Sequence, residues 1–404
     1  MELVTAAEIE EAAALLAPVV RHTPVESSRP LDELIGGPVL LKCENLQRTG
    51  SFKIRGAYTR IARLTDAERA AGVVAASAGN HAQGVALAAR LLGCSAQVFM
   101  PVGASIAKLT ATRAYGATVD LHGATIDEAL AAAREFSDRT GAVLVHPFDH
   151  PDIVRGQGTV GLEILEQVPE LATLVVSLGG GGLLSGVSAY VRERRPDVRL
   201  IGVQAEQAAA WPRSLSEGRP VRLHQMSTLA DGIAVGEPTA LTFAHVSDLV
   251  DEVVTVSENQ LSRAMLLLLE RAKLVVEPAG AATVAAIMAE PHRFTPPAVA
   301  ILSGGNIDPV VLLHVIQHGL VAAGRFLSLR VDIPDRPGSL AGLLALLGES
   351  GANVLDVSHS RLGPTLALGR VLVEVQLECR GDEHATALVA SLGEAGFAAQ
   401  VVTE

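Results

Sequence analysis

Aromatic side chains are scarce in this sequence and make up only 3% of its 404 residues. A buried core must therefore be built mainly from the abundant Ala, Val, Leu and Ile side chains. The three cysteines, Cys43, Cys94 and Cys379, are scattered and form neither a disulfide framework nor a CxxC metal pair. This use of cysteine is typical of a reducing compartment.

Basic charge and long apolar runs are scarce as well. The chain carries 32 Lys and Arg against 44 Asp and Glu, a net charge of −12, which argues against nucleic acid as the main partner. No apolar run approaches the roughly 18 residues that a membrane span needs. The first 20 residues carry four glutamates and no basic residue, which is opposite to a signal peptide. We therefore expect a cytoplasmic protein that binds neither nucleic acid nor membrane.

Short apolar runs alternate with helical patterns along most of the chain. Strands are expected at 39–42, 73–76, 97–100, 118–121, 143–146, 174–178, 200–204 and 298–302, and helices at 6–17, 81–92, 106–115, 126–139 and up to about 195. This alternation is typical of βαβ units in parallel sheets. We expect a two-lobed α/β catalytic domain over residues 1–320, with the smaller lobe at about 45–150.

The pattern changes near residue 320. Residues 319–324 are small and weakly patterned, which predicts a connector. Strands are then expected at 326–333, 352–361, 367–378 and 397–402, and helices at 340–349 and 382–395. This β-α-β-β-α-β order predicts a second, ferredoxin-like domain over residues 326–404.

Lys53 is one of only four lysines and lies in a glycine-flanked segment, Thr49-Gly50-Ser51-Phe52-Lys53-Ile54-Arg55-Gly56-Ala57. One interpretation is a solvated lysine at a helix start, since most lysines are solvated. The other is a Schiff-base lysine, whose amine attacks an aldehyde cofactor. This segment alone leaves both interpretations open.

Two further segments predict anion sites at helix starts. Ser77-Ala78-Gly79-Asn80-His81 follows a strand, and free N–H groups there suit a carboxylate; an ordinary N-cap is the alternative. Gly179-Gly180-Gly181-Gly182-Leu183 also follows a strand, and its backbone amides can approach a phosphate closely; a flexible loop is the alternative. The glycine run does not match GxGxxG, so a dinucleotide site is weakly supported.

A fourth segment, Ser303-Gly304-Gly305-Asn306, follows the apolar run at 298–302. Ligands of α/β proteins bind at such strand ends, although a plain turn is the alternative. His146, Asp149 and His150 suggest a metal site, but Pro147 prevents the helix that would align them. The sequence has no HExxH and no GxSxG motif. We therefore expect no metal.

In this order, the four segments resemble the pyridoxal-phosphate enzymes of the tryptophan-synthase β family, fold type II. The closest likeness is to the threonine dehydratases, also called threonine ammonia-lyases. It covers roughly residues 5–320, and residues 51–57 are its most specific match. Residues 326–402, with Asp335-Arg336-Pro337-Gly338-Ser339-Leu340, resemble an ACT domain, a module that binds amino acids.

The resemblance implies a role for each segment. Lys53 would hold the cofactor covalently and later move the Cα proton, with Phe52 beside the pyridine ring. Asn80 would bond the cofactor's phenolate oxygen, Ser303 the pyridine nitrogen, and Glu277 would lie near the ring. The substrate carboxylate would bind at Ser77, Ala78, Gly79, Asn80 and His81. The cofactor phosphate would bind at Gly179, Gly180, Gly181, Gly182 and Leu183.

A serine at the pyridine nitrogen has a chemical consequence. A neutral hydroxyl does not hold that nitrogen protonated, so the cofactor is a weaker electron sink and a long-lived carbanion is disfavoured. Expelling a β-hydroxyl relieves the charge. The resemblance therefore implies β-elimination, which converts L-threonine to 2-oxobutanoate and ammonia, and L-serine to pyruvate.

Several alternatives are weighed against this reaction. Serine racemases of the family carry a second serine where this chain has Ala78, and acidic metal ligands where it has Gln204 and Ala210, so racemisation and a divalent-metal requirement are not expected. Glu206 leaves a monovalent ion open. A serine or 3-hydroxyaspartate dehydratase also stays open, because one methyl group in a pocket is worth only about 1–3 kcal/mol. No signal indicates β-replacement as in cysteine synthase. A non-catalytic amino-acid sensor is disfavoured by the intact Lys53.

The ACT resemblance implies control by an amino acid, with leucine, isoleucine, valine and threonine all possible effectors. Because ACT units commonly pair, we expect a homodimer or homotetramer with the effector between subunits. A purely structural dimerisation element is the alternative. Gly351-Ala352-Asn353-Val354 marks the loop-to-strand edge where ligands of such domains often bind. Isoleucine biosynthesis and threonine catabolism both remain open as pathways.

Overall fold

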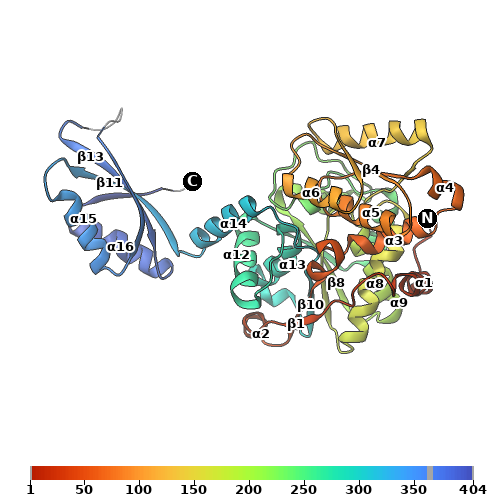
Figure 1. The fold of residues 1–404 in the computed structure, drawn as a ribbon. Coiled ribbons are helices and arrows are strands. Elements are labelled where there is room, and N and C mark those ends of the chain that lie inside the picture. The colour runs from red at the N-terminus through yellow and green to blue at the C-terminus, as the bar shows by residue number, and fades with distance from the viewer. Residues whose placement is uncertain (1, 362–366, 403–404) are drawn as a thin grey trace. The chain divides into compact units, whose positions relative to one another are not determined.

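The computed structural model describes residues 2–361 and 367–402. The chain divides into two compact units, Met1–Val311 and Leu312–Glu404. The first unit holds two sheets and the second holds one (Figure 1). Within the described residues, no helix is long and apolar enough to cross a membrane.

The larger lobe of the first unit is built on a six-stranded sheet with the order β1-β2-β10-β7-β8-β9. All neighbours are parallel except β1, which is antiparallel to β2. The strands are β1 Val25–Ser27, β2 Val39–Lys42, β7 Thr173–Ser177, β8 Arg199–Ala205, β9 Glu252–Val256 and β10 Ala298–Ile301. The helices are α1 Ala6–Leu16, α2 Arg29–Ile35, α8 Pro151–Gln167, α9 Gly182–Arg194, α10 Ala210–Glu217, α11 Ala240–Leu249, α12 Glu258–Leu267 and α13 Pro278–Ala289.

The smaller lobe contains a fully parallel four-stranded sheet with the order β5-β4-β3-β6. Its strands are β3 Val73–Ala76, β4 Ala96–Met100, β5 Thr118–Leu121 and β6 Val143–Leu144, and its helices are α3 Lys53–Ala62, α4 Asp66–Ala71, α5 Asn80–Leu91, α6 Ile106–Ala114 and α7 Ile126–Thr140. Alternate residues of β3 enter different cores: Val73 packs with α3 and α5, and Val74 packs with α7. The sheet is therefore covered on both faces, as parallel sheets are.

The second unit is an antiparallel sheet with the order β12-β13-β11-β14. Its elements are β11 Phe326–Pro334, α15 Ser339–Glu349, β12 Asn353–Ser360, β13 Arg370–Glu378, α16 Asp382–Glu394 and β14 Ala398–Val401. Alternate strand residues such as Leu329 and Val373 are fully buried against Leu343 and Leu392 of the two helices. The predicted α/β class and the β-α-β-β-α-β order are both confirmed.

The segment 319–324, expected as a connector, is mostly helical. Helix α14, Pro309–Ala322, runs through most of this segment and ends only shortly before β11. Pro309 supplies a favourable first helical residue, and the apolar residues that follow sustain the helix. The small residues near its end were therefore a poor guide, since alanine and leucine favour helix regardless of pattern.

Candidate active site

Two loops far apart in the sequence pair as a short antiparallel ladder. Ser51 forms an isolated bridge with Gly304, the Phe52 N–H donates to the Ser303 carbonyl at 3.2 Å, and the Gly305 N–H donates to the Gly50 carbonyl at 2.9 Å. This pairing follows from the sheet order, because β10 lies beside β2 and both chains leave the sheet at the same edge. It places the buried Ser303 next to the start of α3, where Lys53 lies.

A buried ion network fixes α3. The Arg55 guanidinium donates to both oxygens of Glu44 at 2.8 Å and to Glu163 Oε1 at 2.7 Å, and Lys42 donates to Glu163 Oε2 at 2.5 Å. All four side chains are buried. A planar guanidinium held by two carboxylates fixes both the position and the rotation of the helix that carries it. Arg55 thereby fixes the first turn of α3, and Lys53 with it.

The Lys53 amine is partly buried and donates to the Pro147 carbonyl at 3.0 Å. It also lies 5.1 Å from the centre of the Phe52 ring. Desolvation lowers the pKa of Lys53 to about 8, and the nearby Glu277 opposes this shift only in part. An amine with this pKa is neutral in a useful fraction near neutral pH, as a nucleophile or base must be. Lys53 is therefore not fully solvated, and its role as the Schiff-base lysine stays a prediction.

Asn80 opens α5 and joins the two lobes. Its Nδ2 donates to Glu277 Oε1 at 2.6 Å, and its Oδ1 accepts from Asn306 Nδ2 at 2.8 Å. Glu277 is buried just before α13, and desolvation, reinforced by the Asp231 charge, raises the pKa of Glu277 to about 7. The structure thus brings Asn80, Glu277 and the Ser303 loop together.

The segment from Ser77 to His81 forms the half-buried entrance to α5. Ser77 Oγ accepts the Gly79 N–H at 3.1 Å, so this N–H is satisfied within the loop. The first-turn N–H groups that follow have no helical acceptor and can bind an anion. His81 is buried, its Nε2 bonds the Val145 carbonyl at 2.8 Å, and desolvation lowers its pKa to about 3. His81 therefore stays neutral and anchors the loop without adding charge.

The glycine loop from Gly179 to Leu183 is buried and joins β7 to α9. Gly181 has φ +96°, and a Cβ there would lie 2.7 Å from Thr242 Cβ and 2.8 Å from Trp211 Cζ2. A Cβ on Gly180 would overlap the Phe148 ring. Only glycine fits these positions, because neighbouring side chains already occupy the places that a Cβ would need. The first-turn amides of α9 have no helical acceptor, and they form a cradle that suits a phosphate.

Three residues at the site were missed from the sequence. Pro147 supplies the acceptor for Lys53, Phe148 packs against the glycine loop, and Trp211 donates its Nε1–H to the Gly179 carbonyl at 2.7 Å. The one signal in the sequence was that Trp211 is the only tryptophan. The structure shows that it is fully buried. The contacts of Pro147 and Phe148 depend on the fold alone.

The positions considered for metals have other partners. Gln204 Oε1 accepts the Trp211 N–H at 2.9 Å, which fixes the turn before α10. His146 Nδ1 accepts the Asp149 N–H at 2.8 Å, and His150 Nδ1 accepts the Asp152 N–H at 3.1 Å at the start of α8. Each of these groups thus orders local backbone.

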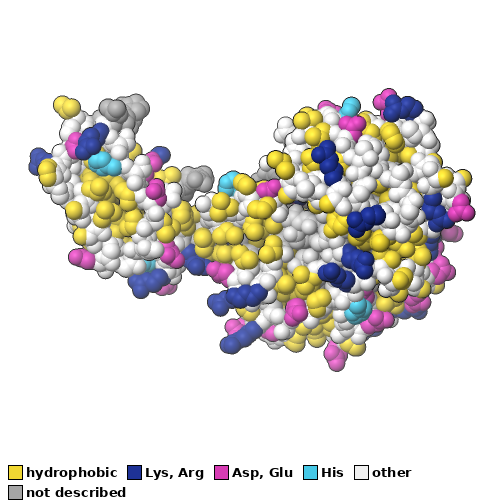
Figure 2. All heavy atoms as spheres, in the orientation of Figure 1, with side chains coloured by type: hydrophobic (Ala, Val, Ile, Leu, Met, Phe, Trp, Pro, Cys, Tyr) yellow, Lys and Arg dark blue, Asp and Glu magenta, His cyan; other side chains and the backbone are white. Residues whose placement is uncertain are grey.

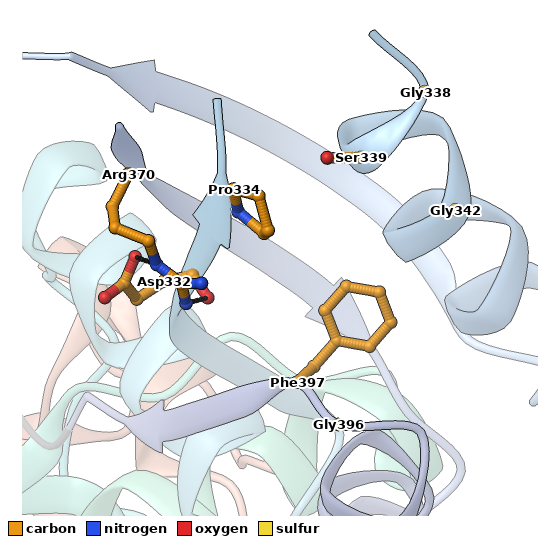
Figure 3. A pocket seen from close by; sticks show the side chains of 8 residues that line it. All are labelled: Asp332, Pro334, Gly338, Ser339, Gly342, Arg370, Gly396 and Phe397. Atoms are coloured by element: carbon orange, nitrogen blue, oxygen red, sulfur yellow. Dashed lines mark hydrogen bonds and ion pairs between the residues drawn. The ribbon is translucent and has the colours of Figure 1, made fainter. Parts of the chain in front are cut away.

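The second unit holds a separate cavity of about 320 Å³. Arg370 of β13 and Asp332 of β11 form an ion pair at 2.9 Å beside it (Figure 3). The other lining residues are Pro334, Gly338, Ser339, Gly342, Gly396 and Phe397. The strand register puts Pro334 opposite Arg370 and Asn353 opposite Glu378, so the cavity and Asn353 lie at opposite ends of the sheet.

Comparison with known proteins places these features in a family. A family model described as "Pyridoxal-phosphate dependent enzyme" matches residues 16–304, and an ACT-domain model matches residues 327–394. An L-threonine ammonia-lyase of Thermotoga maritima is 46% identical over 99% of this chain and 100% of its own length. The structure of threonine deaminase isoform 2 from Solanum lycopersicum is 36% identical, with TM-score 0.74 over 79% of this chain and 91% of that one. The structure of maize serine racemase is 36% identical, with TM-score 0.74 over 79% of this chain and 99% of that one.

Proposed function

This chain belongs to the family of pyridoxal-phosphate-dependent enzymes, and from that premise we propose that it is an L-threonine ammonia-lyase. The enzyme eliminates water from L-threonine, and water then hydrolyses the released product to 2-oxobutanoate and ammonia. L-serine gives pyruvate and ammonia in the same way. The observation that carries the proposal is the convergence of Lys53, Asn80 and Ser303 on one site. The relatives named for the same reaction support it.

The residues present fit pyridoxal phosphate. The first-turn amides of the glycine loop suit a phosphate. The desolvated Lys53 amine donates to Pro147, whose neighbour Phe148 packs against that loop. We assign the phosphate to Gly179–Leu183, the pyridine nitrogen to Ser303 and the phenolate oxygen to Asn80. When bound, the cofactor supplies an electron sink for the electron pair left at Cα.

The chain's own groups supply binding and proton transfer. The N–H groups at the start of α5 bind the substrate carboxylate, next to Ser77. Lys53 then takes the Cα proton as its neutral amine, which its lowered pKa favours. The neutral hydroxyl of Ser303 would not hold the pyridine nitrogen protonated, which would favour departure of the β-hydroxyl over a long-lived carbanion.

Ala78 weighs against a racemase. It stands where the serine racemases of this family carry a hydroxyl on the far face of the substrate, and its methyl group cannot carry a proton. A serine or 3-hydroxyaspartate dehydratase would use the same residues, so only relative turnover separates it from the proposed enzyme. An amino-acid sensor would need neither the desolvated Lys53 amine nor its covalent chemistry.

We assign an amino-acid effector to the ACT unit, within the cavity beside Asp332 and Arg370. A paired carboxylate and guanidinium can exchange partners with the ammonium and carboxylate of a free amino acid. The ACT unit and an exposed apolar face on α14 support a homodimer or homotetramer. Hydrophobic side chains gather on that face (Figure 2), where Val310, Leu313 and Val321 are at least half exposed.

The cellular setting is part of the same proposal. Cys43, Cys94 and Cys379 are all buried and free, which fits a reducing compartment. We therefore place the enzyme in the cytoplasm.

A steady-state assay of the purified protein tests this function. We expect 2-oxo acid from both L-threonine and L-serine, with a higher kcat/KM for L-threonine, and a visible absorption band from lysine-bound cofactor. Lys53→Ala should abolish turnover and the band. Lys273→Ala, which removes an exposed lysine that donates to the Glu270 carbonyl, should change neither. Turnover by Lys53→Ala close to wild type would exclude this role for Lys53, and a coloured protein without 2-oxo acid would favour the sensor.

A further inference from the structure

We propose that Asn306 is a positioning residue that fixes the amide orientation of Asn80, so that Asn80 presents an N–H donor, and not its oxygen, to the cofactor. The inference rests on the proposed function, which gives Asn80 its place at the cofactor's phenolate oxygen. Asn306 is the last residue of the Ser303 segment, whose only role assigned so far is the contact of Ser303 with the pyridine nitrogen. The Ser77 segment and the Ser303 loop are thereby joined through one amide.

The argument begins at a group whose polarity is fixed. Asn306 Nδ2 donates to the Thr49 backbone carbonyl at 2.5 Å, and a carbonyl can only accept. The Asn306 amino group must therefore face Thr49. Its second N–H points to Asn80 at 2.8 Å, which requires an acceptor at that position. Only Oδ1 of Asn80 can serve, so the Asn80 amino group faces away from Asn306.

The other side of Asn80 agrees with this orientation. Its Nδ2 donates one N–H to Glu277 Oε1 at 2.6 Å, which leaves one N–H for a further acceptor. Reversing the amide would set two oxygens against each other at Glu277 unless that carboxyl were protonated. The phenolate of the cofactor, an acceptor with negative charge, matches the remaining donor.

Asn306 also holds the segment that leads to Lys53. Thr49 has φ +63° and ψ 11°, a left-handed conformation that is strained for a β-branched residue. Such strain persists only where the surroundings hold it, and the Asn306 bond holds the Thr49 carbonyl. Gly50 lies against Asn306, where a Cβ would overlap its Oδ1. One side chain therefore orients Asn80 and constrains the approach to Lys53.

Asn306→Asp tests the orientation because it keeps the shape but replaces the amino group by an acceptor. Asn80 should then turn its amino group toward the new carboxylate and its oxygen toward the cofactor. We expect a changed ratio of the visible absorption bands of the holoenzyme, about tenfold or greater loss of kcat, and weaker cofactor binding in equilibrium dialysis. Asn306→Ala, which adds no charge, should change the spectrum in the same direction.

The matched control is Asn45→Asp. Asn45 is a buried asparagine that also donates to a backbone carbonyl, that of Val275 at 3.1 Å, and it packs against Gly305. We expect this control to leave the spectrum unchanged. A spectral change equal to that of Asn306→Asp would mean that Asn306 acts through general packing and not by orienting Asn80.

A double-variant cycle isolates the coupling. In an Asn80→Ala background, Asn306→Asp should cause a smaller spectral change than in the wild type, because the amide that it reorients is gone and only its contact with Thr49 remains. Additive changes, or an Asn306→Asp holoenzyme with the wild-type spectrum and kcat, would overturn the proposal. The spectral and dialysis measurements need no turnover, so a wild-type protein inactive on L-threonine would count against the proposed substrate alone.

Discussion

Asn80 of the smaller lobe donates to Glu277 of the larger lobe at 2.6 Å, and Glu277 is buried. A second contact between the lobes, the ion pair of Lys108 with Asp231 at 2.5 Å, lies near the same site. The residues assigned to cofactor and substrate therefore come from both lobes. A change in how the lobes meet would alter the site directly, and the predictions below use this dependence.

Loading of pyridoxal phosphate onto the apoenzyme should depend on pH through Lys53. Its pKa is lowered to about 8, so the amine is protonated and unreactive below that pH and becomes neutral above it. The loading rate, followed by visible absorption, should rise with pH and reach half of its maximum at about pH 8. An unperturbed lysine would instead give a midpoint near about 10.4. Glu277→Gln should move the midpoint to lower pH, because it removes an anion that stabilises the ammonium form.

Gly181→Ala should weaken cofactor binding by about tenfold or more. The new Cβ would meet Thr242 and Trp211, so the loop must shift away from its phosphate-binding shape. Gly141→Ala is the matched control, since Gly141 also has a positive φ, +78°, but no atom lies within 4 Å of the place that a Cβ would occupy. Equilibrium dialysis of both variants measures the difference. Equal affinities would mean that the glycine loop tolerates a side chain and does not form the phosphate cradle.

Arg55→Ala should destabilise the catalytic unit by about 3–5 kcal/mol, because it leaves Glu44 and Glu163 buried without their principal cation. Arg29→Ala, which breaks an exposed pair with Glu33, should leave the stability nearly unchanged. Urea unfolding followed by tryptophan fluorescence reports on this unit, because the single Trp211 lies within it. Similar losses in the two variants would show that the network contributes little to stability.

Gly342→Leu should abolish the effect of an amino-acid effector while preserving basal activity. Gly342 lines the ACT cavity and has no atom within 4 Å of a Cβ position, so a leucine would fill the cavity without disturbing the fold. Gly348→Leu is the control, because Gly348 lies on the same helix, is equally unobstructed and does not line the cavity. Isoleucine and valine are titrated against initial rate. A retained response in Gly342→Leu would place the effector elsewhere, such as at residues 351–354.

Much of the fold was determined locally by the sequence. Strands β2 and β3 occupy the residues that the apolar runs predict, because buried parallel strands must be short and apolar between helices. The glycine-flanked Lys53 and the run Gly179–Gly182 were also recognisable, since a positive φ or a close approach restricts the choice of residue. The sequence could not show the extent of α14, whose small residues gave no clear pattern.

Only the tertiary structure decided which of these segments meet. Asn306 and Asn80 are 226 residues apart in the sequence. Their contact depends on β10 lying beside β2 and on α3 packing against both α5 and α8. The same holds for Pro147, Phe148 and Trp211, which bear no motif and act through a carbonyl, a ring face and an indole N–H. The sequence determined the reactive groups, because their chemistry belongs to residue type. Tertiary structure determined their orientation and pKa, because hydrogen bonding and desolvation depend on neighbours that local sequence does not specify.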